Sequence, residues 1–326
     1  MNILITGGCG FIGSNFINQF FGSLSMEDKL INLDAMYYCA NENNIREKIR
    51  KSSNYVLVKG NLCDYNLIEY IINRYEITHI INFAAQSHVQ NSFDNSIQFT
   101  YDNILGTHTL LEVCKKYGKI KKFIHCSTDE TFGQSIIHDD EKPKTEESIL
   151  CPSNPYAATK AGAELIAQSY YHSFKMPIII SRGNNTFGGE SLQYPEKLIP
   201  RFIDLLVNNK KVTIQGTGFN LRAFLHIDDT VNAFKILLER GKEGEIYNIG
   251  CDLGMEYSVL DVAKMLIKKI KNTEDYEQWI EYIEDRPFND TRYFISNDKL
   301  KSLGWKVNVN FEDGIDRLLK RMEIIK

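Results

Sequence analysis

A tyrosine and a lysine lie one helical turn apart in the segment Tyr156-Ala157-Ala158-Thr159-Lys160. Residues four apart share a helix face, so the phenol and the ammonium can meet at one site. A free tyrosine has a pKa of about 10 and is a poor base at neutral pH. A neighbouring ammonium stabilises the phenolate, and lowering the pKa by ~3 units needs about 4 kcal/mol. The pair predicts a proton-abstracting tyrosine, although this spacing alone is also common on ordinary helix surfaces.

A hydroxyl and two adjacent carboxyls follow an apolar segment in Ser127-Thr128-Asp129-Glu130. Residues at the carboxyl ends of parallel strands form the ligand crevice of α/β folds. A solvated turn or a helix cap would explain an isolated Asp-Glu pair. Between a glycine loop and Tyr156, the pair instead predicts a general acid and a general base, whose proximity pushes their pKa values apart.

Glycines spaced GxxGxxG, at Gly7, Gly10 and Gly13, stand between a short apolar segment and a helical pattern. The first allows a tight turn, the second lets the backbone approach a pyrophosphate, and the third lets the helix pack on the sheet. The helix N-terminus offers N–H groups and a positive dipole to phosphates. Asp34 follows about twenty residues later, where a carboxylate binds a ribose 2′-hydroxyl and repels a 2′-phosphate. The pattern predicts NAD rather than NADP.

Alternating strands and helices must position these groups. We predict strands over 2–6, 29–34, 55–59, 77–83, 122–127 and 177–182, and helices over 11–21, 103–117, 156–174 and 259–269. Apolar strands separated by helices indicate an α/β fold with a doubly wound parallel Rossmann sheet. We expect strands over 223–227 and 244–250 to rejoin the first domain. The predicted division is an NAD-binding Rossmann domain, 1–182 plus about 223–250, and a smaller, interleaved C-terminal substrate-binding lobe, about 183–222 plus 251–326.

Composition excludes several classes of protein. The net charge of −4 argues against nucleic-acid binding, which needs clustered basic side chains. No apolar run approaches the ~18 residues of a membrane span. The seven cysteines form no CxxC pair, so no metal site is predicted. The odd cysteine number and the lack of a signal-like leader lead us to expect a cytoplasmic protein.

Together these motifs resemble those of the nucleotide-diphosphate-glucose 4,6-dehydratases, which are extended short-chain dehydrogenases. The resemblance also rests on Phe83-Ala84-Ala85-Gln86-Ser87-His88 and Tyr194-Pro195-Glu196-Lys197-Leu198-Ile199-Pro200. It implies a hydro-lyase that oxidises C4 of a glucose unit with NAD, eliminates water across C5 and C6, and returns hydride to C6. Sister 4-epimerases share the glycine loop and YxxxK but generally lack the Asp-Glu pair.

The resemblance implies a role for each matched residue. Tyr156, supported by Lys160, takes the 4-hydroxyl proton, and Thr128 hydrogen-bonds the 4-oxygen. Glu130 removes the C5 proton, and Asp129 protonates the departing 6-hydroxyl. The residues implied to bind NAD are Gly7, Gly10, Phe11, Ile12, Gly13, Asp34, Asn61, Leu62, Ala84, Ala85, Asn103, Tyr156 and Lys160. Those implied to bind the substrate are Ser87, His88, Thr128, Asn185, Glu196, Lys197, Leu198, Arg222 and Arg286.

Two further segments predict which nucleotide the substrate carries. Tyr38-Cys39-Ala40-Asn41 and Arg286-Pro287-Phe288-Asn289-Asp290 are similar to segments of UDP-glucose 4,6-dehydratases of the plant rhamnose synthase type. We therefore expect conversion of UDP-glucose to UDP-4-keto-6-deoxyglucose, in the synthesis of rhamnose or another 6-deoxysugar, with dTDP-glucose as the alternative substrate. A 4-epimerase and a non-catalytic NAD-binding regulator are less favoured interpretations. Relatives dimerise through a helix pair, so the helices over 103–117 and 156–174 predict a homodimer.

Overall fold

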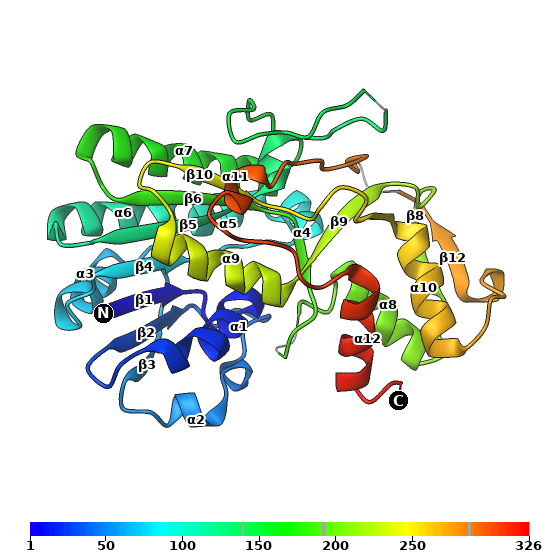
Figure 1. Ribbon diagram of the computed structural model, residues 1–326, viewed down its shortest axis with the longest axis horizontal. Helices are drawn as coiled ribbons and strands as arrows, with labels where there is room; N and C mark the ends of the chain where they lie inside the picture. The colour runs from blue at the N-terminus through cyan, green and yellow to red at the C-terminus, as the bar shows by residue number, and fades with distance from the viewer. Residues whose placement is uncertain (139, 191–192, 286–287, 326) are drawn as a thin grey trace.

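The computed structural model describes residues 1–138, 140–190, 193–285 and 288–325, and its centre is one large sheet (Figure 1). Seven strands pair in the order β10-β6-β5-β4-β1-β2-β3, and every neighbouring pair is parallel. The chain starts near the centre and winds outward in both directions, which confirms the predicted doubly wound Rossmann sheet. The strands are β1 (Asn2–Thr6), β2 (Lys29–Asp34), β3 (Tyr55–Lys59), β4 (His79–Asn82), β5 (Lys122–Thr128), β6 (Ile178–Gly183) and β10 (Ile246–Ile249).

The strands are apolar on both faces because helices cover both (Figure 1). Successive side chains of a strand point to opposite faces. Along β1, Ile3 and Ile5 belong to one buried core together with α1 and α9, whereas Leu4 belongs to a second core with α3, α6 and α7. These helices are α1 (Phe11–Phe20), α3 (Tyr65–Arg74), α6 (Gly106–Tyr117), α7 (Pro155–Phe174) and α9 (Ile227–Arg240).

A smaller lobe lies at one end of the large sheet (Figure 1). It contains a three-stranded sheet in the order β11-β9-β7 and a parallel pair formed by β8 and β12. The rings of Phe187, Phe224 and Phe311 pack together in its core, with centroids 4.9 to 6.4 Å apart. Its elements are β7 (Asn185–Phe187), α8 (Leu198–Val207), β8 (Val212–Gln215), β9 (Leu221–His226), β11 (Glu256–Ser258), α10 (Val259–Lys271), β12 (Ile280–Ile283) and α12 (Phe311–Arg321).

One strand belongs to a different sheet from the one expected. The strand predicted over 223–227 was to rejoin the first domain, but β9 pairs with β7 and β11 in the smaller lobe. The physical reason is Phe224, whose ring stacks on Phe311 in the aromatic core of that lobe. β10 does join the large sheet, beside β6, as predicted. The division of the chain into two domains stays a prediction.

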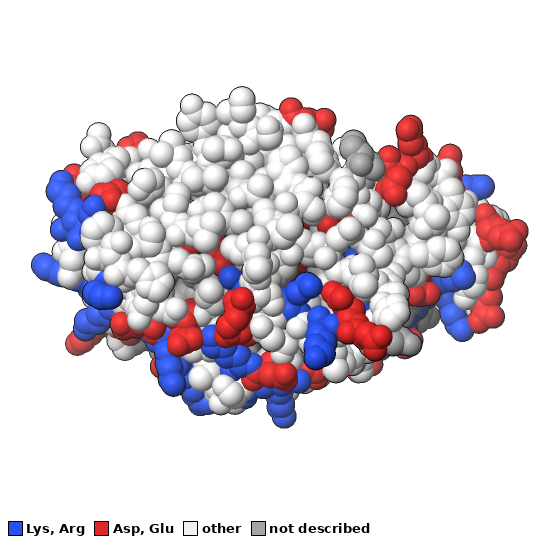
Figure 2. Space-filling model, turned by 90° about the horizontal axis from the view of Figure 1, so that it is seen from above, with Lys and Arg blue, Asp and Glu red and all other residues white. Residues whose placement is uncertain are grey.

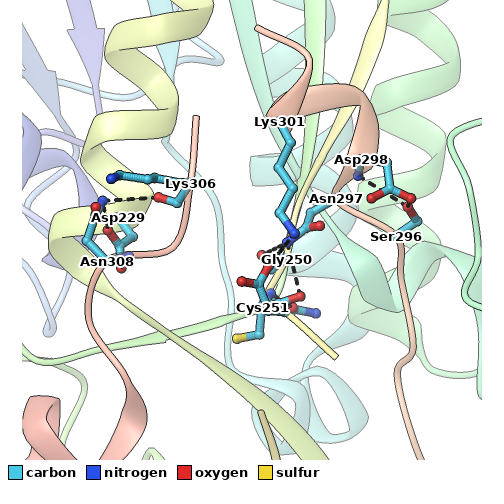
Figure 3. A network of polar contacts seen from close by, with 11 residues as sticks. Asp229, Gly250, Cys251, Ser296, Asn297, Asp298, Lys301, Lys306 and Asn308 are labelled. Carbon is cyan, nitrogen blue, oxygen red and sulfur yellow. Dashed lines mark hydrogen bonds and ion pairs between the residues drawn. The ribbon is translucent and has the colours of Figure 1, made fainter. Parts of the chain in front are cut away.

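The C-terminal segment crosses back over the large sheet before α12, and polar contacts hold it there (Figure 3). Asn297 Nδ2 donates to the carbonyl oxygens of Gly250 and Cys251 at 3.0 and 3.2 Å. Asp229 accepts from the backbone N–H and the side-chain amide of Asn308, at 3.1 and 3.0 Å. These bonds fasten the segment to the end of β10 and to the start of α9.

Shorter elements complete the fold. The helix predicted over 103–117 begins as a π-helical segment, Thr100–Leu105, and continues as α6. The short helices are α2 (Glu47–Arg50), α4 (Val89–Asp94), α5 (Ser96–Phe99) and α11 (Asp298–Lys301).

None of the helices in the described ranges is long and apolar enough to cross a lipid bilayer.

Candidate active site

A cleft opens where the carboxyl ends of the large sheet meet the smaller lobe. Its lining combines the residues that follow β1, β2, β4 and β5 with side chains such as Tyr194 from the smaller lobe. Ligands of doubly wound folds bind in this position, where the strand order reverses. Arg286 lies outside the described residues. The predicted site residues that line the cleft are Gly7, Gly10, Phe11, Ile12, Gly13, Asp34, Asn61, Leu62, Ala84, Ala85, Ser87, Thr128, Asp129, Glu130, Tyr156, Lys160, Asn185 and Lys197.

The glycine loop leaves no space for a side chain at two positions. A Cβ at Gly7 would lie 2.8 Å from Ala84 Cα, and its φ of +68° also favours glycine. A Cβ at Gly13 would lie 2.4 Å from the carbonyl oxygen of Gly7. α1 begins at Phe11 with none of the described side chains capping it and no acidic residue in its first turn. Its first N–H groups can therefore bind a phosphate.

Asp34, at the end of β2, holds the glycine loop in place. Its Oδ2 accepts from the backbone N–H of Cys9 at 2.8 Å, and its Oδ1 accepts from that of Met36 at 2.8 Å. Burial raises the pKa of this carboxyl, and the two N–H groups act against that shift. Each carboxylate oxygen has a further lone pair, so Asp34 can still accept a hydrogen bond from a ribose hydroxyl.

Asn103, which was predicted to bind the cofactor, does not line the cleft. Its Oδ1 accepts from the N–H of Gln86 at 2.7 Å, and its Nδ2 donates to Gln86 O at 3.0 Å and to Thr159 Oγ1 at 2.9 Å. The amide therefore joins the loop after β4 to α7. The side chain thus fixes the backbone of the cleft, and direct contact of Asn103 with the cofactor stays a prediction.

Four predicted substrate ligands also lie outside the lining of the cleft: His88, Glu196, Leu198 and Arg222. Glu196 accepts a short hydrogen bond from the Tyr38 hydroxyl, and Leu198 packs on the core of the smaller lobe. His88 directly precedes α4. Arg222 donates to Asn289 Oδ1 at 3.0 Å, and its charge lowers the pKa of Asp129. Arg222 thus acts on the cleft through its charge and without lining it.

Two carboxyls lie side by side at the edge of the sheet. Thr128 ends β5, and Asp129–Phe132 forms a single 3₁₀ turn directly after it. The N–H of Glu130 donates to Thr128 Oγ1 at 3.3 Å, and Thr128 Oγ1 donates to Asp129 Oδ1 at 3.2 Å. All three side chains are buried. The turn therefore fixes a hydroxyl and two carboxyls at one point of the cleft.

Asp129 has the surroundings of an acid. Burial, followed by the charge of Glu130, raises the pKa of Asp129 to about 7. Asn184 Nδ2 donates to Asp129 Oδ2 at 2.6 Å, and Asn184 Oδ1 accepts from the N–H of Cys251 at 2.9 Å. Asp129 is therefore mostly protonated below neutral pH, and Asn184 fixes its orientation.

Glu130 has different neighbours. Its Oε2 accepts from Asn154 Nδ2 at 3.2 Å and from the Tyr293 hydroxyl at 3.3 Å. Asn154 Oδ1 also accepts from the N–H of Ala157 at 2.9 Å and so caps α7, whose first residue is Pro155. One asparagine therefore sets both the start of the helix that carries the candidate tyrosine and the place of the Glu130 carboxyl.

Tyr156 and Lys160 both reach the cleft from α7, as their spacing predicts. Burial, followed by the charge of Glu130, raises the pKa of Tyr156 well above its usual value. Lys160 Nζ donates to the carbonyl oxygen of Cys126 at 2.5 Å, and stabilisation of the phenolate by this ammonium together with the nicotinamide charge stays a prediction. Burial lowers the pKa of Lys160 itself. A further positive charge beside the phenol is needed to make it a base near neutral pH.

Three polar contacts of the carboxyls were not predicted from the sequence. Asn154 had a usable local signal, since an asparagine before a proline is typical of a helix start. Asn184 stands beside the predicted Asn185, and only the structure distinguishes which amide reaches Asp129. Tyr293 is separated from Glu130 by 163 residues, so no local pattern could have located it.

Comparison with known proteins gives consistent matches along the chain. A family model described as GDP-mannose 4,6 dehydratase matches residues 4–318. The chain is 46% identical to a dTDP-D-glucose 4,6-dehydratase of Dictyostelium discoideum, over 97% of this chain and 80% of that protein. A crystal structure of dTDP-glucose 4,6-dehydratase from Bacillus anthracis in complex with NAD has a TM-score of 0.88 and 38% identity, covering 99% of this chain and 96% of that one.

A plant protein matches over part of its length. The chain is 44% identical to a trifunctional UDP-glucose 4,6-dehydratase/UDP-4-keto-6-deoxy-D-glucose 3,5-epimerase/UDP-4-keto-L-rhamnose-reductase of Arabidopsis thaliana. The match covers 98% of this chain and 47% of the plant protein. This chain therefore spans about half the length of that relative.

Proposed function

Because this chain belongs to the nucleotide-sugar 4,6-dehydratases of the extended short-chain dehydrogenase type, we propose that it converts dTDP-glucose to dTDP-4-keto-6-deoxyglucose and water. As a member of this family it is an NAD-dependent hydro-lyase. The observation that carries the proposal is the pair of unlike carboxyls beside Tyr156: Asp129, with a pKa of about 7, and Glu130. Elimination of water requires one group that removes a proton and another that delivers one to the leaving hydroxyl.

The residues of the cleft fit NAD. The glycine loop has no space for a Cβ at Gly7 or Gly13, and the first N–H groups of α1 carry no side-chain cap among the described residues. A pyrophosphate can approach there, and Asp34 can bind a ribose hydroxyl. When bound, NAD supplies a hydride acceptor and donor for the sugar, and a positive charge beside Tyr156.

The side chains of this protein supply the proton transfers. Tyr156 accepts the proton of the 4-hydroxyl as C4 is oxidised, and the Thr128 hydroxyl binds the same oxygen. The 4-ketone makes the C5 hydrogen acidic, and Glu130 removes it. Asp129 gives its proton to the 6-oxygen as the C6–O bond breaks, and water leaves. Glu130 then returns a proton to C5 when C6 has been reduced.

The sequence segments predicted UDP-glucose as the substrate, with dTDP-glucose as the alternative. The comparisons favour the alternative, dTDP-glucose. The relative named for dTDP-glucose is matched over most of its length, whereas only about half of the plant protein named for UDP-glucose is matched. Thymine and uracil differ by one methyl group, which is worth ~0.8 kcal/mol when buried. We therefore expect kcat/KM for dTDP-glucose to exceed that for UDP-glucose by about fourfold.

Lys197 and Asn185 are the proposed diphosphate ligands. Both line the cleft, and Lys197 Nζ donates to the carbonyl oxygen of Ser87 at 2.9 Å. An ammonium has three donors, so the lysine can bind this carbonyl and a phosphate oxygen together. The charge of Arg222 would add to the attraction of the anion.

The test is incubation of the purified protein with dTDP-glucose and UDP-glucose separately, followed by mass spectrometry of the sugar nucleotide. The expected product has lost the mass of one water. Asp129→Asn and Glu130→Gln should each slow this loss by at least ~100-fold. A product of unchanged mass would instead indicate a 4-epimerase, and unimpaired dehydration in both variants would remove the proposed roles.

We also propose that the protein forms a homodimer through α6 and α7. Leu165 and Phe174 on α7 are each more than half exposed. The face that looks upward in Figure 1, where α7 lies, is largely without charged side chains at its centre (Figure 2). Sedimentation at micromolar concentration should give a dimer, and Leu165→Glu should give a monomer. Tyr70→Glu, a similarly exposed position on α3, is the control and should leave the dimer intact.

A further inference from the structure

A second phenol lies against the Glu130 carboxyl. The hydroxyl of Tyr293 is 3.3 Å from Glu130 Oε2, and it also makes a short hydrogen bond with Asp290 Oδ2. The other oxygen of that aspartate, Oδ1, accepts from Ser153 Oγ at 2.6 Å. Tyr293 and Asp290 are buried, at 6% and 4% exposure. A chain of four side chains therefore runs from the candidate base to the half-buried Ser153.

Counting the protons shows in which protonation state every hydrogen bond of this series of side chains has both a donor and an acceptor. A phenol has one proton to donate, and an ionised carboxylate has none. With both carboxyls ionised, Tyr293 can satisfy only one of them. When Glu130 is protonated, its O–H can donate to the Tyr293 oxygen, and the phenol donates to Asp290. Every bond in the chain then has a donor and an acceptor.

The surroundings keep the phenol neutral and in place. Burial, followed by the charges of Glu130 and Asp290, raises the pKa of Tyr293 far above its usual value. The guanidinium of Arg222 lies over the ring, 5.1 Å from its centroid, and acts in the opposite direction. Asn220 Nδ2 donates to the carbonyl oxygen of Asp290 at 3.0 Å and so anchors the backbone. The phenol is thus a fixed hydrogen-bonding group between two carboxyls.

We propose that Tyr293 and Asp290 are positioning residues for the elimination step, and that they bind the protonated form of Glu130. The inference rests on the proposed function. As Glu130 takes the C5 proton, the electrons of the C5–H bond form the C5–C6 double bond. The 6-oxygen leaves as water with the proton of Asp129. Tyr293 accepts the new Glu130 O–H and holds the C5 proton at that carboxyl until it returns to the sugar.

Tyr293→Phe removes the hydroxyl and keeps the ring. We expect kcat to fall by ~2- to 10-fold, the range for a lost hydrogen bond between neutral groups, with KM within about twofold. The isotope effect of [5-²H]-labelled substrate on kcat should rise, because proton removal from C5 becomes slower than oxidation at C4. The acid limb of the pH profile of kcat should move to lower pH. Asp290→Asn, whose amide oxygen can still accept from the phenol, should lose less activity than Asp290→Ala.

The control is Tyr247→Phe, which removes another buried hydroxyl. Tyr247 lies in β10, and its hydroxyl accepts from the N–H of Lys242 at 3.2 Å. It should leave kcat and the isotope effect unchanged. A Tyr293→Phe enzyme with wild-type kcat would overturn the inference, as would a fall in kcat without a change in isotope effect or acid limb. If Tyr293→Phe does not fold, the Asp290 variants decide by the same measurements. A wild-type protein that forms no dehydrated product would overturn the proposed function instead.

Discussion

Arg182 and Glu164 form an ion pair that solvent hardly reaches, close to the 3₁₀ turn Asp129–Phe132. The Nε and Nη2 of the arginine donate to Glu164 Oε1 at 3.1 and 2.6 Å, and the side chains are 3% and 0% exposed. Its Nη1 donates to Glu146 O at 2.9 Å, and its guanidinium carbon lies 4.5 Å from the Phe132 ring centroid. Because Glu164 lies on α7 and Phe132 ends the turn that carries Glu130, one cation ties together the two elements of the candidate site.

Arg182→Met should lower the free energy of unfolding by about 3–5 kcal/mol, because it leaves the Glu164 carboxylate buried without its partner. Urea denaturation followed by circular dichroism measures this. The double variant Arg182→Met with Glu164→Leu should recover much of the loss, since no buried charge remains. The control is Lys51→Met, which breaks the exposed pair Lys51–Glu47 and should cost less than ~0.5 kcal/mol. Equal losses at the two sites would contradict this account.

Gly13→Ala should destabilise the glycine loop and weaken NAD binding. The new Cβ would meet the carbonyl oxygen of Gly7 at 2.4 Å, and backbone cannot move aside as a flexible side chain can. Overpacking of this kind costs about 1–3 kcal/mol. Calorimetry gives both the melting temperature and the NAD affinity. Gly22→Ala is the matched control, because no described atom lies within 4 Å of its new Cβ. Tight NAD binding by the Gly13 variant would refute the role of close packing.

The parts of the site that could be predicted are those with local signals. Thr128, Asp129 and Glu130 come where an apolar strand stops, and strand ends of a parallel sheet meet at one edge. Tyr156 and Lys160 share a helix face by their spacing alone. The glycine loop follows from the spacing of its residues and from the acid that ends the next strand.

The parts that could not be predicted depend on contacts between distant segments. The side chain of Asn103 could point to the cleft or to Gln86. The packing of the loop after β4 against α7 decides between these two directions. The direction of Lys160 follows from the carbonyl of Cys126, which the spacing of Tyr156 and Lys160 does not reveal. The aromatic core around Phe311 determines which sheet β9 joins. Helical and strand periodicities carry no information on these choices.

Asn184→Ala should change how Asp129 titrates. The amide donates to Asp129 Oδ2 at 2.6 Å and so lowers the pKa of that carboxyl. Without it, the pKa of Asp129 should rise by about one unit, because the ionised form loses a hydrogen bond. The basic limb of the pH profile of kcat should therefore move to higher pH by about that amount. An unchanged basic limb would show that Asn184 acts only on orientation or that Asp129 does not set this limb.

Asp129→Asn should stabilise the fold, and more so at high pH. Burial raises the pKa of this carboxyl from 3.8 to about 7, so its contribution to stability is full below 3.8 and is lost as pH rises through 7. The whole loss is at most about 4 kcal/mol. The asparagine does not titrate, so the difference in free energy of unfolding between variant and wild type should be about 2–3 kcal/mol larger at pH 8 than at pH 5. Urea denaturation at the two pH values measures it. A difference that stays constant would mean that Asp129 ionises in its ordinary range, and its assignment as the acid would then fail.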